Sequence, residues 1–314
     1  MSHSRRIYLA LASAAFCLLS FRLAVPARAM DSEQALEDQI ISKVRSGGIE
    51  AAVEQARQAV KQYPQSSRLH QLLGAALFKK GLNEEARAAF RRAIELDATV
   101  AENYFNLALI ELSENRLAEA IPLLEKCSSL DPENAQAHLL LGRAYHNLNQ
   151  TVSAIEHFKK ALALAPRLPL GHYHLGYAYQ SQGNMEQALV EFRKEVEVNP
   201  VFYDPYWLIG NIELNRGHLD AAEQEYRKAA GLKQRAPEAH YGLARVLVAR
   251  KKWQEAEAEI KQALESNPNS LEAHYVLARI YQQTGKNDDA LREYRICSAL
   301  RLKNQKSGIA GKQP

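Results

Sequence analysis

A period of 34 residues runs through the chain and limits its possible folds more than any other feature. Seven full repeats follow one another without insertion, and they begin at Ser67, Ala101, Ala135, Pro169, Tyr203, Pro237 and Leu271. A weaker repeat covers residues 33–66. Each repeat holds two apolar segments with helical spacing and a short break between them. One helix pair cannot bury its apolar face alone, so the repeats must stack into an all-α solenoid.

Residue size recurs at fixed positions, which we number 1–34 from the start of each repeat. Alanine occupies position 20 in all eight repeats, where only a small side chain lets the two helices approach closely: Ala52, Ala86, Ala120, Ala154, Ala188, Ala222, Ala256 and Ala290. Position 8 is glycine or alanine in the seven full repeats, position 7 is leucine or isoleucine, and position 24 is bulky. These positions predict the contact between the two helices of a pair.

Breaks between helices recur as well. Position 32 is proline in five repeats and ends the second helix, since proline cannot continue it: Pro64, Pro132, Pro166, Pro200 and Pro268. Glycine at position 15 suits the left-handed residue that often ends a first helix: Gly81, Gly183, Gly217 and Gly285.

These residues resemble the tetratricopeptide-repeat (TPR) pattern at the family spacing, over residues 33–304. The resemblance implies antiparallel helix pairs in a right-handed superhelix, whose concave face is lined mainly by the first helices. The expected repeats are 33–66, 67–100, 101–134, 135–168, 169–202, 203–236, 237–270 and 271–304. Residues 305–314 are expected to form a disordered basic tail. A capping helix after the last repeat is not evident, so its final helix is expected to fray or to pack on a partner.

Residues 1–29 have the pattern of a signal peptide. Arg5 and Arg6 precede an uncharged, mostly apolar run over residues 7–21, and small residues at Ala27 and Ala29 favour cleavage before Met30. The run is short for a membrane anchor, which needs about 20 apolar residues. The paired arginines also resemble a twin-arginine signal, but no cofactor that would need that route is visible, which favours general secretion. We expect a periplasmic or secreted protein without a stable membrane span after cleavage.

The charge of the remaining chain excludes some partners. The net charge of +4 comes from Arg5, Arg6, Arg22 and Arg28, so the chain after residue 29 is neutral. Binding of nucleic acid or of anionic membranes needs a basic field, and neither is expected. Cys127 and Cys297 are five repeats apart, too far for a disulfide, so both are expected to be free and buried.

No sequence motif indicates catalysis, a cofactor or a metal. The repeats occupy residues 33–304, and the chain lacks phosphate-binding loops, nucleophile elbows, H-E-x-x-H and C-x-x-C. Five histidines occupy position 4, where packing is expected rather than metal binding: His70, His138, His172, His240 and His274. Glu111, Glu195 and Glu213 stand at positions that are usually apolar, small or tyrosine; their stems are expected along apolar surface with their carboxylates in water.

The concave face supplies the candidate binding residues. Position 5 is aromatic in five repeats, position 9 lies one turn further on the same face, and position 6 carries one asparagine. The candidates are Phe105, Asn106, Arg143, Tyr173, Tyr177, Trp207, Asn211, Tyr241, Arg245, Tyr275 and Arg279. Tyrosine at 5 and asparagine at 9 are also common in the family as ordinary scaffold. Arginine at 9 departs from the family average and favours an acidic or carboxylate-bearing ligand.

The function expected from the resemblance is a non-catalytic scaffold that binds a protein or an extended peptide in the groove. The alternative is a TPR subunit of a cell-envelope, secretion or glycan-processing enzyme complex. RNA binding of the pentatricopeptide kind is disfavoured by the neutral charge and the export signal. Gln71, Ala75 and Asn106 do not reproduce the clamp that grips a chaperone's C-terminal carboxylate.

Overall fold

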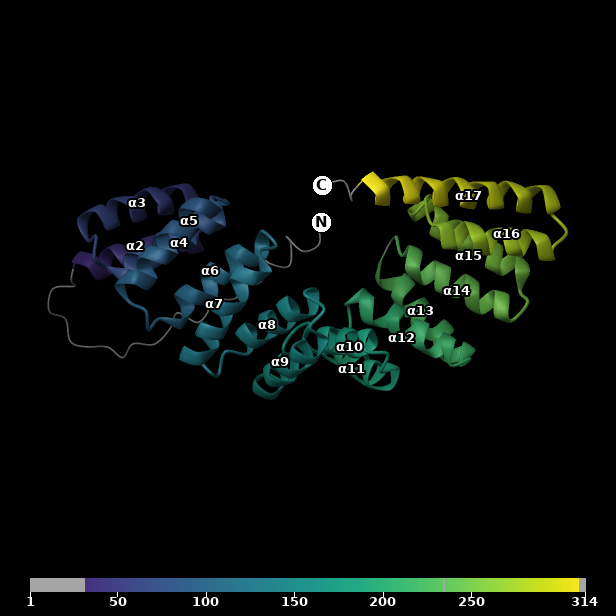
Figure 1. Ribbon diagram of the computed structural model, residues 1–314, viewed down its shortest axis with the longest axis horizontal. Helices are drawn as coiled ribbons and strands as arrows, with labels where there is room; N and C mark the ends of the chain where they lie inside the picture. Colours follow the sequence, from purple (N-terminus) through teal and green to yellow (C-terminus); the bar gives the residue numbers. More distant parts are fainter. Residues whose placement is uncertain (1–31, 234, 311–314) are drawn as a thin grey trace. The chain divides into compact units, whose positions relative to one another are not determined.

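The computed structural model describes residues 32–233 and 235–310, the last five of them by backbone alone. These residues form helices in consecutive pairs, one pair for each repeat (Figure 1). The signal peptide expected over residues 1–29 lies outside the described residues, as do residues 311–314 of the expected tail. No helix in the described part is both long and apolar enough to cross a bilayer.

The chain divides into two compact bodies at Leu168 and Pro169, which is a boundary between repeats. The N-terminal body holds α2 (Ser32–Arg45), α3 (Ile49–Gln62), α4 (Ser67–Lys80), α5 (Asn83–Leu96), α6 (Ala101–Ser113), α7 (Leu117–Leu130), α8 (Ala135–Asn147) and α9 (Thr151–Leu164). The C-terminal body holds α10 (Gly171–Ser181), α11 (Met185–Val198), α12 (Tyr203–Asn215), α13 (Leu219–Leu232), α14 (Pro237–Ala249), α15 (Trp253–Ser266), α16 (Leu271–Gln283) and α17 (Asn287–Ala310).

The turn inside each repeat has the same conformation. The residue at position 15 has a positive φ in all eight repeats, including the four glycines expected from the sequence. The remaining ones are Gly47, Asn115, Asn149 and Lys251. After α4, Gly81 N donates to Phe78 O (2.9 Å) and Leu82 N donates to Leu77 O (3.0 Å), which satisfies the last carbonyls of the helix.

Small and large residues meet inside each pair as the sequence indicates. The alanines at position 20 are fully buried in seven repeats and 4% exposed at Ala290. Position 8 faces the ring or branched side chain at position 24: a Cβ added to Gly176 would lie 2.8 Å from the ring of Phe192, and one added to Gly142 would lie 2.5 Å from Phe158. A larger residue at position 8 would therefore force the two helices apart.

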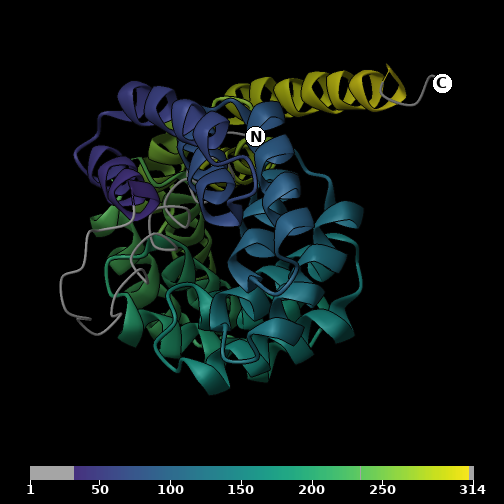
Figure 2. The ribbon, with the colours of Figure 1, turned by 90° about the vertical axis from the view of Figure 1, so that its left-hand side faces the viewer.

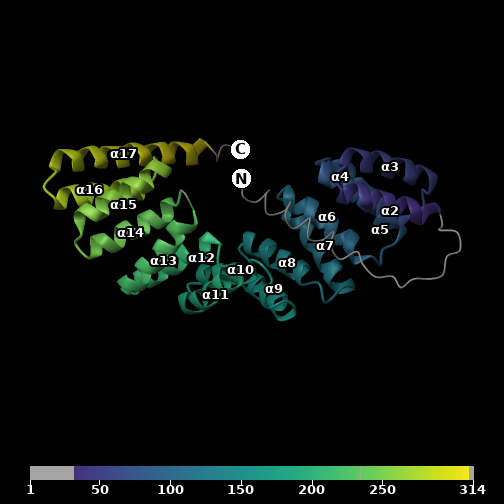
Figure 3. The same ribbon diagram turned by 180° about the vertical axis from the view of Figure 1, so that it is seen from behind.

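Stacking places the first helices on one side of each body. Each second helix contacts the first helix of the next repeat, for example α13 with α14 and α15 with α16. Consecutive first helices also contact one another, α12 with α14 and α14 with α16 in the C-terminal body. Among the described residues of that body, the second helices α11, α13 and α15 contact one another less than the first helices do. Consecutive first helices therefore lie closer together than consecutive second helices, which places the first helices on the inner side of each stack. Figure 3 shows the same helix pairs from behind.

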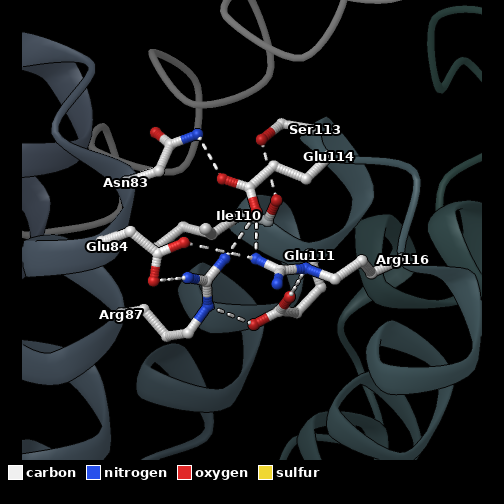
Figure 4. Close-up of polar contacts among 8 residues, drawn as sticks. All are labelled: Asn83, Glu84, Arg87, Ile110, Glu111, Ser113, Glu114 and Arg116. Carbon is white, nitrogen blue, oxygen red and sulfur yellow. Dashed lines mark hydrogen bonds and ion pairs between the residues drawn. The ribbon is translucent and has the colours of Figure 1, made fainter.

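Two of the three unusual glutamates are buried in ion pairs, contrary to the sequence expectation. Glu111 is 3% exposed: its Oε1 lies 2.8 Å from Arg87 Nε and its Oε2 lies 2.8 Å from Arg116 Nε (Figure 4). Glu213 is also 3% exposed and contacts Arg193 (2.7 Å) and His218 (2.8 Å). Both carboxylates link neighbouring repeats, because Arg87 and Arg193 belong to the preceding second helix. Charged and polar partners replace water around both carboxylates, and among these partners only Arg87 is itself buried.

Glu195 departs further from the expectation, since it is 0% exposed. Its carboxylate accepts hydrogen bonds from the backbone nitrogens of Leu170 and Tyr173, both at 3.1 Å, at the start of α10. Leu170 has a φ of 65° and α10 begins at Gly171, two residues after the repeat boundary. Burial raises the pKa of Glu195, although these backbone N–H groups partly offset the effect. Glu195 thus caps α10 from inside the stack.

The end of the chain also differs from the expectation. The structure continues α17 to Ala310, so residues 305–310 are helical rather than part of a disordered tail. No proline interrupts this stretch, and the helix can therefore propagate beyond the last repeat. Cys127 and Cys297 are both free, as expected. Cys127 is buried, which raises the pKa of its thiol to about 12, whereas Cys297 is only partly buried.

Three of the five histidines at position 4 bind a glutamate within their own repeat. Nδ1 of His172, His240 and His274 lies 2.6–2.7 Å from a glutamate at position 23 of the second helix: Glu191, Glu259 and Glu293. Nε2 of His274 also lies 3.0 Å from Pro268 O, in the turn before its helix. These histidines therefore join the two helices of a pair, and His274 also reaches the preceding turn. No group of three possible metal ligands gathers among the described residues.

The repeat of α8 and α9 differs from these three, because His157 stands where they have the glutamate. His138 Nδ1 and His157 Nδ1 lie 3.2 Å apart, and the ring of Tyr145 stacks on His157. Burial lowers the pKa of both histidines, and Lys160 lowers both further. Glu156 and Glu125 act on His157 in the opposite direction but do not cancel the effect.

We expect the N-terminal body to lose stability as the pH falls from 7 to 5. The folded pKa values of His138 and His157 lie below the unfolded value of about 6.5, so their stabilisation is complete above that pH and is lost as pH falls toward the folded values. His157→Glu restores the pair seen in the other repeats. It should raise the free energy of unfolding at pH 5 by about 1 kcal/mol relative to wild type. Urea unfolding at both pH values measures this, and equal acid loss in both proteins would contradict it.

Candidate binding surface on the first helices

Position 5 differs between the two bodies. In the last three repeats of the N-terminal body it is buried, with Gln71, Phe105 and Leu139 at 2–3% exposure, whereas Glu37 in the first repeat is partly exposed. In the C-terminal body Tyr173, Trp207 and Tyr241 are partly exposed, and Tyr275 is 49% exposed. The candidate Phe105 is therefore a core residue, and its expected place on the surface is wrong. The available aromatic row lies on α10, α12, α14 and α16 alone.

The buried position 5 of the N-terminal body has a visible cause. Gln71 is held by Glu102, to which its Nε2 donates at 2.8 Å, and Arg68 Nη1 lies 3.8 Å from the same carboxylate. Phe105 packs in the apolar core together with Leu109 and Leu140. Asn106 and Arg143 remain partly exposed in this body. Three of the eleven candidates, Phe105, Asn106 and Arg143, therefore belong to the N-terminal body and are not part of the aromatic row.

The row begins in an aromatic cluster on α10. The ring of Tyr173 lies 5.0 Å from that of Phe202 and 6.2 Å from that of Tyr177. Burial raises the pKa of Tyr173, and the carboxylate of Asp204 adds to the effect. Tyr177 is 42% exposed. The cluster holds Tyr173 in place and presents Tyr177 to solvent.

Next in the row, Trp207 and Asn211 on α12 are both oriented by hydrogen bonds. Trp207 Nε1 donates to Asp204 Oδ1 at 3.3 Å, and the indole packs against a buried cluster that contains Tyr206 and Ala239. The hydroxyl of Tyr226 donates to Asn211 Oδ1 at 2.7 Å. This bond fixes the orientation of the Asn211 side chain, whose amide nitrogen can donate to a partner.

Arginines accompany the last two aromatics of the row. The guanidinium of Arg245 lies 5.7 Å from the ring centroid of Tyr241, one turn away on α14. Arg279 on α16 is exposed, and the ring of Tyr275 beside it lies 6.0 Å from that of Tyr294. A planar guanidinium next to an aromatic ring suits contact with a carboxylate above an apolar surface.

A row of carboxylates at position 2 was missed by the sequence analysis: Asp204, Glu238 and Glu272. They lie in the first turn of α12, α14 and α16, where negative charge favours the helix. Asp204 raises the pKa of Tyr173 and Glu272 raises that of Tyr241, after burial, which is the larger cause for both. Asp204 and Glu272 therefore each lie near the aromatic of the preceding repeat. The signal was present in the sequence as an acidic residue at one repeat position.

The charge on this surface therefore changes sign along α14 and α16, from carboxylates at position 2 to arginines at position 9. Position 2 and position 9 are separated by about 10 Å along a helix axis. Carboxylates lie at one edge, the aromatic row lies between, and Arg245 and Arg279 lie at the other edge. Such a surface can hold an extended chain whose apolar side chains rest on the rings and whose charged groups match the two edges.

Comparison with known proteins identifies the repeat. A family model described as tetratricopeptide repeat matches residues 38–101, 105–169, 173–240, 208–270 and 241–296. No curated protein sequence matches the chain significantly.

Solved structures share the fold. PilF of Pseudomonas aeruginosa is 20% identical with a TM-score of 0.60, and the match covers 68% of this chain and 97% of that one. YrrB, described as "a TPR protein with an unusual peptide-binding site", is 24% identical with a TM-score of 0.53, covering 60% and 96%. The Cut9-Hcn1 hetero-tetramer of APC/C matches at 18% identity and a TM-score of 0.57, covering 88% and 53%. Since the family model matches nearly all of residues 38–296, the chain belongs to the tetratricopeptide-repeat family.

Proposed function

We propose that this protein is an exported, non-catalytic scaffold that binds an extended peptide segment of a partner along α10, α12, α14 and α16. The observation that carries the proposal is the contrast at position 5. The same repeat position is buried in three repeats of the N-terminal body, at Gln71, Phe105 and Leu139, and forms a partly exposed aromatic row in all four repeats of the C-terminal body. Ordinary scaffold packing would bury both alike.

The chemistry of the row describes the partner. Apolar side chains of a bound segment would lie on Trp207, Tyr241 and Tyr275, while Asn211 would donate from its amide nitrogen to a backbone carbonyl. Acidic groups of the segment would form charge-assisted hydrogen bonds with Arg245 and Arg279. Basic groups would be favoured at the opposite edge, beside the carboxylates at position 2. YrrB, which shares the fold, is described as having a peptide-binding site, and this supports a peptide as the kind of ligand.

Export is the second part of the proposal and rests on residues 1–29. The twin arginines, the apolar run and Ala27-Arg28-Ala29 support cleavage before Met30. N-terminal sequencing of the protein from its producing cells should begin at Met30 or within a residue or two. An intact Met1 on cytosolic protein would contradict export.

Binding is tested with peptides selected on the purified chain from a random library and titrated by calorimetry. Trp207→Ala should weaken binding by about 2 kcal/mol, which is close to thirtyfold, as is usual for a central aromatic anchor. Arg245→Ala with Arg279→Ala should weaken binding and flatten its dependence on salt.

Two controls accompany these variants. Arg227→Ala with Lys261→Ala removes two exposed positive charges from the second helices α13 and α15, and it should leave affinity unchanged. Circular dichroism confirms that each variant folds. Unchanged affinity in both groove variants, with the fold retained, would place the site elsewhere.

A further inference from the structure

The stacking of the first helices sets the distance between the rings of the aromatic row. Trp207, Tyr241 and Tyr275 stand at the same repeat position on α12, α14 and α16, which Figures 1 and 2 draw in green to yellow-green. The helices α12 and α14 contact each other, as do α14 and α16. Helices packed in this way have their axes about 8–10 Å apart, so equivalent rings recur along the row at about that interval.

The interval between the rings selects the backbone conformation of an extended segment. A β-strand rises about 3.3 Å per residue and returns a side chain to the same face at every second residue, after about 6.6 Å. A polyproline II helix rises about 3.1 Å per residue with three residues per turn, so a side chain returns to the same face after about 9.3 Å. The polyproline II interval lies within the spacing of the helices, and the strand interval does not. A polyproline II segment can therefore place every third residue on successive rings.

Position 9 presents hydrogen-bond donors to such a segment. Asn211, Arg245 and Arg279 occupy this position on the same three helices, α12, α14 and α16. The Tyr226 hydroxyl orients Asn211, and the guanidinium of Arg245 lies 5.7 Å from the ring centroid of Tyr241. Neither arginine forms an ion pair within the described part of the chain. The donors therefore recur at the same interval as the rings, and they match a ligand that supplies carbonyl or carboxylate oxygens.

The carboxylates at position 2 already accept hydrogen bonds from the protein itself. Trp207 Nε1 donates to Asp204 Oδ1 at 3.3 Å, and the Tyr203 hydroxyl donates to Glu238 Oε2 at 2.9 Å. A backbone N–H laid against the rings would lose its hydration without an acceptor to replace it. Proline has no N–H group, and its ring fixes φ near the value of polyproline II, at about −65°. The row therefore favours proline at the residues that lie on the rings.

We propose that the aromatic row binds an acidic, proline-rich segment of a partner in the polyproline II conformation. This inference rests on the proposed function, since it specifies the peptide that the row would hold. Prolines lie on the three rings, and backbone carbonyls of the segment accept from Asn211. Acidic residues, which recur at every third position on the adjacent face, form charge-assisted hydrogen bonds with Arg245 and Arg279. A segment that holds this conformation before binding loses little conformational entropy on binding.

Three labelled synthetic peptides, titrated with the purified chain by fluorescence anisotropy, test the period and the conformation. The first repeats the triplet Pro-Pro-Glu four times. The second has the same composition, with all prolines in one block and all glutamates in another, so it loses the period of the charges. The third repeats Val-Ser-Glu four times, which keeps that period without the preference for polyproline II. The Pro-Pro-Glu peptide should bind at least tenfold more tightly than either of the others, which is about 1.4 kcal/mol.

Variants of the chain locate the bound peptide. Trp207→Ala and Tyr275→Ala should each weaken binding of the Pro-Pro-Glu peptide more than tenfold. Tyr275 is 49% exposed, so its replacement tests the row even if Trp207→Ala does not fold. Arg227→Ala with Lys261→Ala, on the second helices, is the control and should leave the affinity unchanged.

The outcomes distinguish failure of this inference from failure of the proposed function. If library-selected peptides lose affinity in the row variants but the Pro-Pro-Glu peptide binds no better than the other two, the row binds peptides and the polyproline II assignment is wrong. Selected peptides with apolar residues at every second position, as in a strand, or at every seventh, as in a helix, would also overturn it. If the row variants bind the selected peptides as wild type does, the proposed function and this inference both fail.

Discussion

Arg87→Ala should lower the free energy of unfolding by about 3–5 kcal/mol, because it leaves a buried carboxylate without one of its two arginines. Arg87 is 5% exposed and Glu111 is 3% exposed, and the arginine also contacts Glu114 at 2.6 Å (Figure 4). Chemical unfolding of the variant and wild type measures the difference.

Two controls distinguish the cost of leaving Glu111 unpaired from the cost of removing an arginine side chain as such. Arg92→Ala removes an exposed ion pair with Glu95 (3.0 Å) and should cost less than about 1 kcal/mol. Arg87→Leu with Glu111→Leu copies the apolar residues that other repeats use at these positions, Leu189 and Leu247. The double variant should be more stable than Arg87→Ala. A double variant that is less stable would show that the arginine matters through its packing alone.

Tyr226→Ala should cost about 3–5 kcal/mol, at the upper end for an aromatic core residue. The ring is 0% exposed and lies between two glycines: a Cβ added to Gly210 would be 2.7 Å from it, and one added to Gly242 would be 2.3 Å from it. Glycines offer no side chains that could fill the cavity, so the site cannot collapse easily. Thermal or chemical unfolding of the C-terminal body reports the loss.

Tyr226→Phe is the matched variant, since it keeps the ring and removes only the hydroxyl bonded to Asn211. It should cost about 1 kcal/mol, the usual size for one hydrogen bond. It should also weaken peptide binding, because the Asn211 amide loses its orientation. A loss of stability as large as that of Tyr226→Ala would show that the hydroxyl, and not the ring, supports this part of the stack.

The fold was predictable because every repeat carries the same packing residues. Alanine at position 20, a small residue at position 8 and glycine at position 15 recur often enough to identify the helix pair and its turn. The structure confirms these positions and adds Asn115, Asn149 and Lys251 as left-handed residues of the same turn. Asparagine tolerates this conformation, and lysine adopts it because the surrounding turn requires it.

Polar contacts between repeats were less predictable, because they depend on residues that meet only after stacking. Glu195 looked like an amphipathic surface residue, but it lies under the start of α10 and accepts two backbone hydrogen bonds. Arg87 and Glu111 are 24 residues apart, and no spacing rule for one helix connects them. The expectation for Phe105 was wrong for the same reason: the repeat position alone does not tell which neighbours cover it.

The binding claim can be tested most directly by fluorescence, because the chain has two tryptophans, Trp207 on α12 and Trp253 on the second helix α15. Trp253→Phe leaves Trp207 as the reporter on the aromatic row, and Trp207→Phe leaves only Trp253. A selected peptide should shift and quench the emission of the Trp253→Phe protein and leave the emission of the Trp207→Phe protein unchanged. The opposite pattern, with a response from Trp253 alone at a peptide concentration that saturates binding, would contradict a site on the first helices.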